Sequence, residues 1–351
     1  MYEIEEIKNK IICGDALKEL KQIPNETIDM VITSPPYYGL RNYGIAGQIG
    51  LEKTFQEYLE NILAITAEIK RVLKKSGSLW LNLGDSYGSH SIGASKSAGG
   101  IQKRLCQKEE GFPRYSNKAT SLGDKCLGLM PERIAIAMMD QQGWILRNKI
   151  KWAKQILIKK ENRTIGSVMP TSVKDRFNES GEDLYFFVKN KHYYSNLNAV
   201  KLDIQTFENR PQGIIRCREY GYDSKYLNDY SPQSKQSNVR LNYHPQKNNN
   251  KDTALGKNLP SIWLIQSEPH NFEKELGLDV DHFASFPQAL LEVPIKFACP
   301  ENGLILDPFM GSGTTAIMAK TLGRNFIGIE LNAEYIKITK IRIDAIPPRL
   351  F

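Results

Sequence analysis

The chain has 351 residues, a formal net charge of +8 at pH 7 and five cysteines. This length is sufficient for one large core with an inserted or appended lobe, and no stretch reaches the roughly 18 consecutive apolar residues of a membrane span. The acidic N-terminus does not resemble a signal peptide, so we expect a soluble, cytoplasmic protein with no membrane partner. The cysteines are scattered singly, without histidines at metal-ligand spacing, which disfavours disulfides and a metal site.

The first part of the chain predicts two strands, each followed by a distinctive turn. Residues 9–16 predict a short strand that ends near Asp15, a candidate N-cap for a helix over 16–21. The apolar run 28–33 predicts a buried strand, and the sequence Ser34-Pro35-Pro36-Tyr37 follows it. Because both prolines lack a backbone N–H and have a fixed φ, this turn is rigid and its carbonyls face outward. Taken alone, the turn is equally typical of an ordinary strand-to-loop connection.

The middle of the chain alternates between helical and strand patterns. Apolar residues at helical spacing predict helices over 55–73 and 131–141. Apolar runs predict a strand over 78–83 and two paired strands over 144–152 and 184–189. Residues 86–128 have little periodicity and are long for a loop in a compact domain, which is typical of a disordered segment or a functional loop.

A second motif lies near the end of the chain. The strand pattern 304–306 runs into Asp307-Pro308-Phe309-Met310-Gly311-Ser312-Gly313-Thr314, a helical pattern follows, and the next apolar run ends at Glu330. A strand, a Gly-x-Gly turn, a helix and a second strand ending in an acid are typical of an adenosine-binding βαβ unit. The glycines let the backbone approach the ligand, and the acid can accept hydrogen bonds from both ribose hydroxyls. A final helix is predicted from 333 to about 345, next to the N-terminal strand.

The two motifs together resemble those of the S-adenosylmethionine-dependent amino-methyltransferases of DNA. The catalytic motif of that family reads Asp/Asn/Ser-Pro-Pro-Tyr/Phe, and its cofactor motif reads Asp-Pro-Phe-x-Gly-Ser-Gly-Thr. The catalytic motif comes first here, an order similar to that of the circularly permuted, beta-type members. The resemblance implies an α/β, Rossmann-like class I methyltransferase fold with a mixed, mostly parallel seven-stranded sheet. It also implies direct methyl transfer to an exocyclic amino nitrogen of a base extruded from double-stranded DNA.

The resemblance also implies a domain division and a set of site residues. Residues 1–192 are expected to form the first part of the catalytic domain, 193–260 a target-recognition region, and 261–351 the cofactor-binding part. The implied catalytic residues are Ser34, Pro35, Pro36 and Tyr37, with Tyr37 stacking on the base. The implied cofactor-binding residues are Asp15, Ala16, Phe286, Pro287, Asp307, Pro308, Phe309, Gly311, Ser312, Gly313, Thr314 and Glu330. For Asp15, contact with the adenine amino group and N-capping both remain open. A packing or capping role is favoured for His282.

Basic side chains indicate where DNA would lie. From Arg147 to Arg176 there are nine Lys or Arg residues against two acids, which favours a phosphate-facing surface over a merely solvated face. The segment 86–128 is expected to order on DNA. The candidate DNA contacts are Arg41, Lys151, Lys154, Ser172, Lys174, Arg176, Arg216, Arg218 and Arg240. For Arg176, an ion pair with Asp175 is an equal alternative.

Alternatives remain for the substrate. A serine at position 34 resembles the members that act on N4 of cytosine, whereas an acid there would indicate adenine, so N6-adenine methylation is the first alternative. A DNA-binding module with a vestigial cofactor fold is the second. An RNA, protein-glutamine or small-molecule methyltransferase is disfavoured by the basic stretch and the long insert. The resemblance also implies a restriction-modification system, and the sequence leaves open both a cognate restriction endonuclease and a homodimer.

Overall fold

The computed structural model describes residues 1–40, 42–88, 122–123, 125–168, 171, 173–202, 258–268 and 286–346. Most of the predicted segment 86–128 and of the predicted target-recognition region 193–260 lies outside the described residues. The candidate residues Arg41, Ser172, Arg216, Arg218, Arg240 and His282 lie outside them as well. Among the described helices, none is long and apolar enough to cross a membrane.

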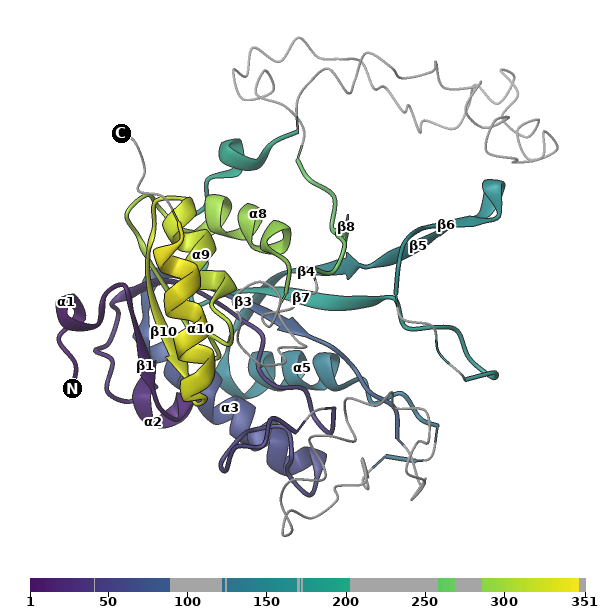
Figure 1. Ribbon diagram of the computed structural model, residues 1–351, viewed down its shortest axis with the longest axis horizontal. Helices are drawn as coiled ribbons and strands as arrows, with labels where there is room; N and C mark the ends of the chain where they lie inside the picture. The colour runs from purple at the N-terminus through teal and green to yellow at the C-terminus, as the bar shows by residue number, and fades with distance from the viewer. Residues whose placement is uncertain are drawn as a thin grey trace, which may run out of the picture.

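An eight-stranded sheet forms the centre of the fold, in the order β1-β10-β9-β2-β3-β7-β4-β8 (Figure 1). Its strands are β1 (Lys10–Cys13), β2 (Ile28–Thr33), β3 (Leu73–Leu83), β4 (Ile145–Ala153), β7 (Gly181–Val188), β8 (Ile262–Leu264), β9 (Leu304–Asp307) and β10 (Asn325–Glu330). The first five strands of this order pair in parallel, and β7 is antiparallel to β3 and β4. The expected mixed, mostly parallel α/β sheet is therefore confirmed, with the short edge strand β8 as one strand more than expected.

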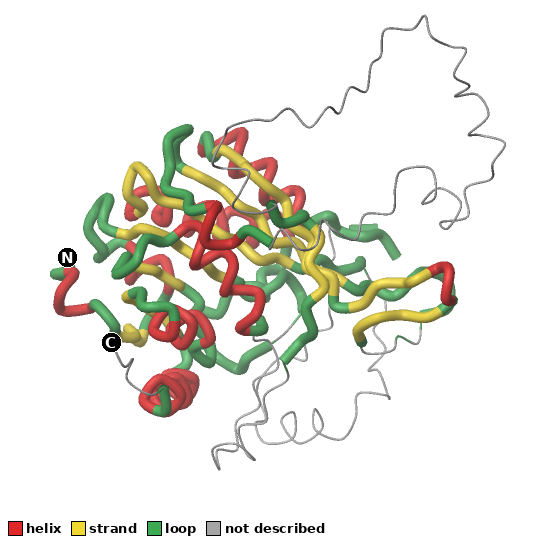
Figure 2. The backbone as a smooth tube through the Cα atoms, turned by 90° about the horizontal axis from the view of Figure 1, so that it is seen from above, coloured by secondary structure: helices red, strands yellow, loops and turns green. Residues whose placement is uncertain are grey.

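Helices cover both faces of this sheet (Figures 1 and 2). They are α1 (Ile4–Ile7), α2 (Ala16–Leu20), α3 (Phe55–Val72), α5 (Met130–Gln142), α8 (Gln288–Ala298), α9 (Thr314–Thr321) and α10 (Ala333–Asp344). Side chains of α2, α3 and α5 form one buried cluster with Val31 of β2, and those of α8 and α9 form a second with Met30 and Ile32. Because neighbouring residues of a strand point to opposite faces, the apolar residues of β2 join both clusters, and every residue of the strand except the half-buried Asp29 is buried.

The helices begin and end where the sequence provides caps. The predicted helix 55–73 is confirmed as α3, whose Thr54 and Glu57 form a capping box that satisfies backbone N–H groups at its start. The predicted helix 131–141 is confirmed as α5, which ends at Gly143 in the left-handed region. The predicted strand 78–83 is confirmed but starts earlier, because the chain continues directly from α3 into β3 at Leu73.

The two ends of the chain meet in the sheet. Strand β10 pairs with β1 through Ile12 and Ile329, and β9 pairs with β2 through Val31 and Leu306. The predicted proximity of the C-terminal part to the N-terminal strand is thus confirmed. Because these strands are parallel, their carboxyl ends lie at one edge of the sheet, which is where ligands bind in open α/β sheets.

A two-stranded hairpin projects from this body (Figures 1 and 2). It consists of β5 (Gln155–Ile158) and β6 (Arg163–Gly166), joined by the short helix η1 (Lys159–Glu161). A second short helix, η2 (Leu197–Val200), follows β7. The hairpin was not predicted, because its residues fall within the basic stretch that was interpreted by charge alone.

Candidate functional site

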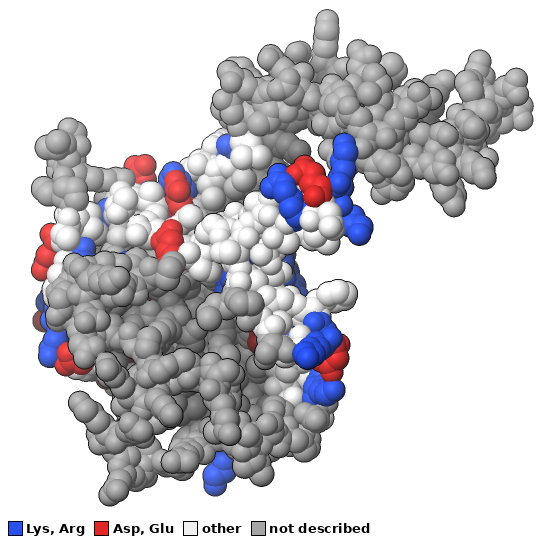
Figure 3. All heavy atoms as spheres, turned by 45° about the vertical axis from the view of Figure 1, so that its right-hand side comes forward, with Lys and Arg blue, Asp and Glu red and all other residues white. Residues whose placement is uncertain are grey.

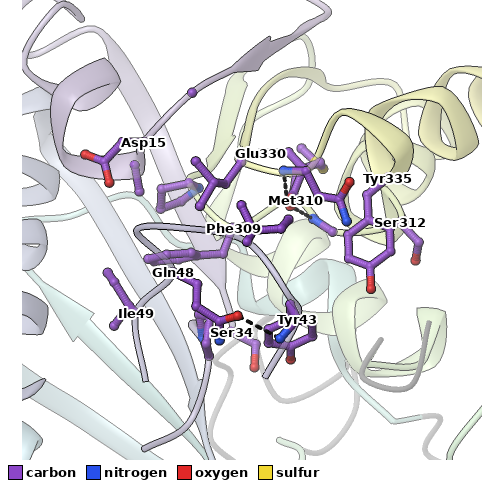
Figure 4. A pocket seen from close by; sticks show the side chains of 18 of the residues that line it. Asp15, Ser34, Tyr43, Gln48, Ile49, Phe309, Met310, Ser312, Glu330 and Tyr335 are labelled. Atoms are coloured by element: carbon purple, nitrogen blue, oxygen red, sulfur yellow. Dashed lines mark hydrogen bonds between the residues drawn. The ribbon is translucent and has the colours of Figure 1, made fainter. Parts of the chain in front are cut away.

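A pocket lies at the carboxyl ends of β1, β2, β9 and β10 (Figure 4). Both motifs contribute to it: Ser34 and Pro36 come from the prolyl turn after β2, and Glu330 ends β10. The other predicted residues that line it are Asp15, Ala16, Phe286, Pro308, Phe309, Gly311, Ser312 and Thr314. The fold therefore brings together two sequences that lie nearly three hundred residues apart.

Asp307 is not among the residues that line this pocket. Its side chain is 1% exposed and lies beneath the glycine turn. Its carboxylate accepts hydrogen bonds from the Thr33 hydroxyl at 2.6 Å, the Thr315 hydroxyl at 2.6 Å and the Phe309 N–H at 3.0 Å. Burial raises the pKa of Asp307 to about 6, although these three donors favour the ionised form. Its place in the structure is that of a support for both motifs, and direct contact with a cofactor has no basis in this geometry.

The glycine turn is shaped by close packing. Gly313 has a φ of +86°, and a Cβ at this position would lie 2.1 Å from Cγ2 of Thr339 in α10. Only glycine fits such a position without movement of its neighbours. Gly313 precedes α9, and neither it nor Pro287, the residue before α8, is among the residues that line the pocket. Their sequence neighbours Phe286, Ser312 and Thr314 do line it.

Glu330 faces the pocket with a carboxylate that is already oriented by backbone N–H groups. Its oxygens accept hydrogen bonds from Gly311 N at 2.7 Å and Asn332 N at 2.8 Å. Burial raises the pKa of Glu330, and the two backbone donors act in the opposite direction. A carboxylate oxygen has more than one lone pair, so the side chain can still accept hydrogen bonds from a ligand.

The pocket residues fit the predicted cofactor. An adenosyl group needs apolar contacts for its ring and an acceptor for its ribose hydroxyls, and the pocket offers Phe309, Met310 and Tyr335 together with Glu330. Among the described residues, no cluster of histidines, cysteines and acids could hold a metal ion.

Asp15 caps a helix and also lines the pocket. Its Oδ1 accepts a hydrogen bond from Lys18 N at 3.0 Å, which confirms it as the N-cap of α2. The same residue lines the pocket. Contact with an adenine amino group stays a prediction.

The prolyl turn is held by hydrogen bonds to its backbone and to its tyrosine. The Tyr58 hydroxyl of α3 donates to the Pro36 carbonyl at 2.9 Å. The Tyr37 hydroxyl donates to Glu182 Oε2 at 2.5 Å and accepts from Asn82 Nδ2 at 2.8 Å. Burial and the nearby Glu182 carboxylate raise the pKa of Tyr37 well above its usual value. Tyr37 and Pro35 are not among the pocket-lining residues, and stacking of Tyr37 on a base stays a prediction.

Gly84 leaves room for the ring of Tyr37. A Cβ on Gly84 would lie 2.5 Å from Cε2 of Tyr37. The absence of a side chain at the end of β3 therefore allows the ring to pack against the backbone, so that its hydroxyl reaches Asn82 and Glu182.

Acidic side chains from outside the stretch 147–176 offset part of its positive charge. Lys154 pairs with Glu182 and lies 4.6 Å from the centre of the Trp152 ring, and Lys151 lies 3.4 Å from Asp183. These acids come from β7, so a count within the stretch misses them. A phosphate contact by Lys154 is therefore disfavoured, whereas Lys174 is exposed. Figure 3 shows basic and acidic side chains side by side on the projecting parts of one face.

The alternative ion pair between Asp175 and Arg176 is not what the structure shows. Asp175 pairs with Lys125 at 2.6 Å, and the Arg176 guanidinium lies 3.8 Å from the centre of the Tyr87 ring. This stacking favours a structural role for Arg176 in the conformation described.

The structure adds pocket residues outside the predicted cofactor-binding set. The loop after the prolyl turn contributes Tyr43, Ile45, Gln48 and Ile49 to the pocket, and the Tyr43 N–H donates to Gln48 Oε1 at 2.7 Å (Figure 4). The turn and helix after Glu330 contribute Leu331, Asn332 and Tyr335. Their position directly after each motif was the available signal. No pattern in the sequence near Asn82 or Glu182 indicates that these residues contact Tyr37.

The chain is similar to known proteins over most of its length. A family model described as "DNA methylase" matches residues 28–341. The type II methyltransferase M.SmaI of Serratia marcescens is 31% identical over 336 residues, which cover 95% of this chain and 90% of that protein. The type II methyltransferase M.XycI of Xanthomonas campestris pv. cyanopsidis is 32% identical over 330 residues, covering 94% and 86%. Among solved structures, PvuII DNA methyltransferase (cytosine-N4-specific) has a TM-score of 0.57 at 19% identity, covering 96% and 88%, a likeness of fold alone.

Proposed function

The chain belongs to the DNA methylase family of S-adenosylmethionine-dependent amino-methyltransferases, and on this premise we propose that it methylates N4 of cytosine in double-stranded DNA. The observation that carries the proposal is the shared pocket of Ser34 and Glu330. A cofactor whose ribose hydroxyls bind Glu330 would lie in the same pocket as Ser34, the side chain that would face the target amine.

The site favours direct transfer. When bound, the cofactor supplies an electrophilic methyl group. The exocyclic amino group of cytosine is a poor nucleophile, because its lone pair is conjugated into the ring. Hydrogen bonds from its two N–H groups to Ser34 Oγ and the Pro35 carbonyl would draw the nitrogen toward a tetrahedral shape and free the lone pair. The base must leave the duplex to reach this position.

The choice of cytosine depends on Ser34, because an acid at this position would indicate adenine. The test is digestion of methylated duplex DNA to nucleosides, followed by mass spectrometry. N4-methylcytosine is the expected product. N6-methyladenine alone would overturn the choice of base but not the family assignment.

The role of Ser34 has a separate test. Ser34→Ala removes one acceptor for the amino group, so we expect turnover to fall about 100- to 1000-fold. Affinity for S-adenosylmethionine, measured by calorimetry, should change little, because the backbone of the turn remains. An undiminished rate would refute this role. Absence of cofactor binding in the unaltered protein would instead favour a DNA-binding module with a vestigial cofactor fold.

We also propose a division of labour along the chain. Residues 1–192 and 261–351 form the catalytic domain, and 193–260 recognise the target sequence. The full-length similarity to proteins named as type II methyltransferases supports a role in a restriction-modification system. A cognate restriction endonuclease would then act on the same site. Base-resolution sequencing of DNA from cells that express the protein would identify that site, and size-exclusion chromatography with light scattering would test for a homodimer.

A further inference from the structure

Ser34 is the pocket-lining end of a chain of hydrogen bonds that continues to a carboxylate. Its hydroxyl donates to Tyr37 Oη at 3.2 Å, and Tyr37 Oη donates to Glu182 Oε2 at 2.5 Å. The side chain of Glu182 is 16% exposed, and its second oxygen is paired with Lys154. The three groups come from the turn after β2 and from β7, so no local sequence pattern connects them.

The direction of these hydrogen bonds is fixed by Asn82. Its Nδ2 lies 2.8 Å from Tyr37 Oη, 2.8 Å from Glu182 Oε2 and 3.4 Å from Ser34 Oγ, so its amide nitrogen faces three oxygens. Tyr37 Oη thus accepts from Asn82 and from Ser34, and its own hydrogen is left for Glu182, since a carboxylate can only accept. The hydrogen of Ser34 is in turn committed to Tyr37. Ser34 Oγ therefore has no hydrogen left to donate to the pocket and can accept an N–H group there, with Asn82 Nδ2 as a second donor at 3.4 Å.

We propose that Ser34, Tyr37 and Glu182 form a proton relay in which Glu182 is the final acceptor of the proton that the target amino group releases. This proposal rests on the proposed function. Glu182 acts through Tyr37 and is a positioning residue and proton acceptor that does not touch the base.

The step balances in atoms and charge. The amine lone pair forms the N–CH₃ bond while the S–CH₃ bond breaks, and the electron pair of that bond stays on sulfur, which becomes a neutral thioether. The nitrogen gives a proton to Ser34 Oγ, the Ser34 proton passes to Tyr37 Oη, and the Tyr37 proton passes to Glu182. The positive charge of the sulfonium and the negative charge of the carboxylate are both lost. A carboxylate is a sufficient base, because the positively charged, four-bonded nitrogen that methylation forms on the base ring is strongly acidic.

The test uses two variants and a matched control in single-turnover methylation of duplex DNA. Glu182→Gln keeps an acceptor for Tyr37 but cannot take up a proton, and Tyr37→Phe keeps the ring but interrupts the relay. Each should lower the rate about 100-fold, in the range of general acid–base catalysis, with unchanged affinity for S-adenosylmethionine. The double variant should be no slower than either single variant, because both interrupt one chain. Glu179→Gln, an exposed acid near the start of β7, should retain the full rate.

A solvent isotope effect separates a relay from simple support. In the unaltered protein the single-turnover rate should be lower in D₂O than in H₂O, because protons move along the relay. In both single variants this difference should disappear. Tyr37→Phe leaves the ion pair between Glu182 and Lys154 intact.

Two outcomes would overturn the relay. One is a rate within about threefold of the unaltered protein in Tyr37→Phe, well short of the loss expected for a broken proton path. The other is an undiminished solvent isotope effect in the slow variants. Neither affects the proposed function, which the methylated nucleoside produced by the unaltered protein tests separately.

Discussion

The Thr33 hydroxyl donates a 2.6 Å hydrogen bond to Asp307 Oδ1 and so connects the last residues of β2 and β9. The next residue after each strand, Ser34 and Pro308, lines the pocket. This buried contact therefore holds the prolyl turn and the glycine turn in a fixed relation. It also explains why a carboxylate is retained at a position that is 1% exposed.

Asp307 should make stability depend on pH. Burial raises its pKa from 3.8 to about 6, so the folded protein favours the protonated form. Its contribution to stability is complete below its unfolded pKa and is lost as pH rises through about 6, a change of about 2–3 kcal/mol. In Asp307→Asn the amide oxygen can still accept from Thr33 and the amide nitrogen can donate to the Thr315 hydroxyl. The amide does not ionise, so this pH dependence is removed.

The measurement is urea unfolding, followed by tryptophan fluorescence, at about pH 4.5 and about pH 8. The free energy of unfolding of Asp307→Asn, relative to the unaltered protein, should increase between these two pH values. The exposed Asp140→Asn serves as the control and should show no such increase. A constant difference for Asp307→Asn would show that the carboxyl does not titrate in this range.

Glu330→Gln should weaken binding of S-adenosylmethionine about 10- to 100-fold, the effect of losing about 1.5–3 kcal/mol of hydrogen bonding to a charged group. Both Glu330 oxygens accept backbone N–H groups, and an amide nitrogen in place of one oxygen would face a donor. Calorimetric titration measures the affinity, with the exposed Glu301→Gln as the control. Equal affinities in the two variants would remove Glu330 from the cofactor site.

The sequence predicts the parallel centre of the sheet and the meeting of the two motifs, because both depend on patterns within short stretches. The apolar run 28–33 and the βαβ signal around Gly311 each predict a strand that ends in a turn. Parallel strands then place those turns at one edge, as the pairing of Val31 in β2 with Leu306 in β9 confirms. The position of each motif residue relative to the pocket was harder to predict, since Asp307 is buried and does not line the pocket.

Contacts between distant segments set the limit of prediction. Glu182 meets Tyr37 across 145 residues, and no periodicity in β7 distinguishes its acid from a surface carboxylate. The same carboxylate neutralises Lys154, which the local excess of charge placed on a DNA-facing surface. Tertiary pairing of this kind depends on strand order and register, and these emerge only from the complete fold.

Gly84→Ala should impair methylation without weakening cofactor binding. The added Cβ would lie 2.5 Å from the Tyr37 ring, which must then move away from Asn82 and Glu182. A displacement of this kind near the reacting groups costs about 10- to 100-fold in rate. Single-turnover kinetics and calorimetry measure the two quantities. A rate equal to that of the unaltered protein would show that the Tyr37 ring keeps its contacts despite the added methyl group.

Gly313→Ala should destabilise the fold by more than its backbone conformation alone requires. Gly313 and Gly47 have nearly equal φ values, +86° and +85°, and an alanine at either position incurs a similar cost of about 1–2 kcal/mol. At Gly47 nothing lies within 4 Å of the added Cβ, whereas at Gly313 it would collide with Thr339. Urea unfolding of the two variants isolates the collision, which should add about 1–3 kcal/mol to the loss at Gly313. Equal losses would show that α10 moves to accommodate the added methyl group. Close packing against Thr339 would then not explain the glycine at position 313.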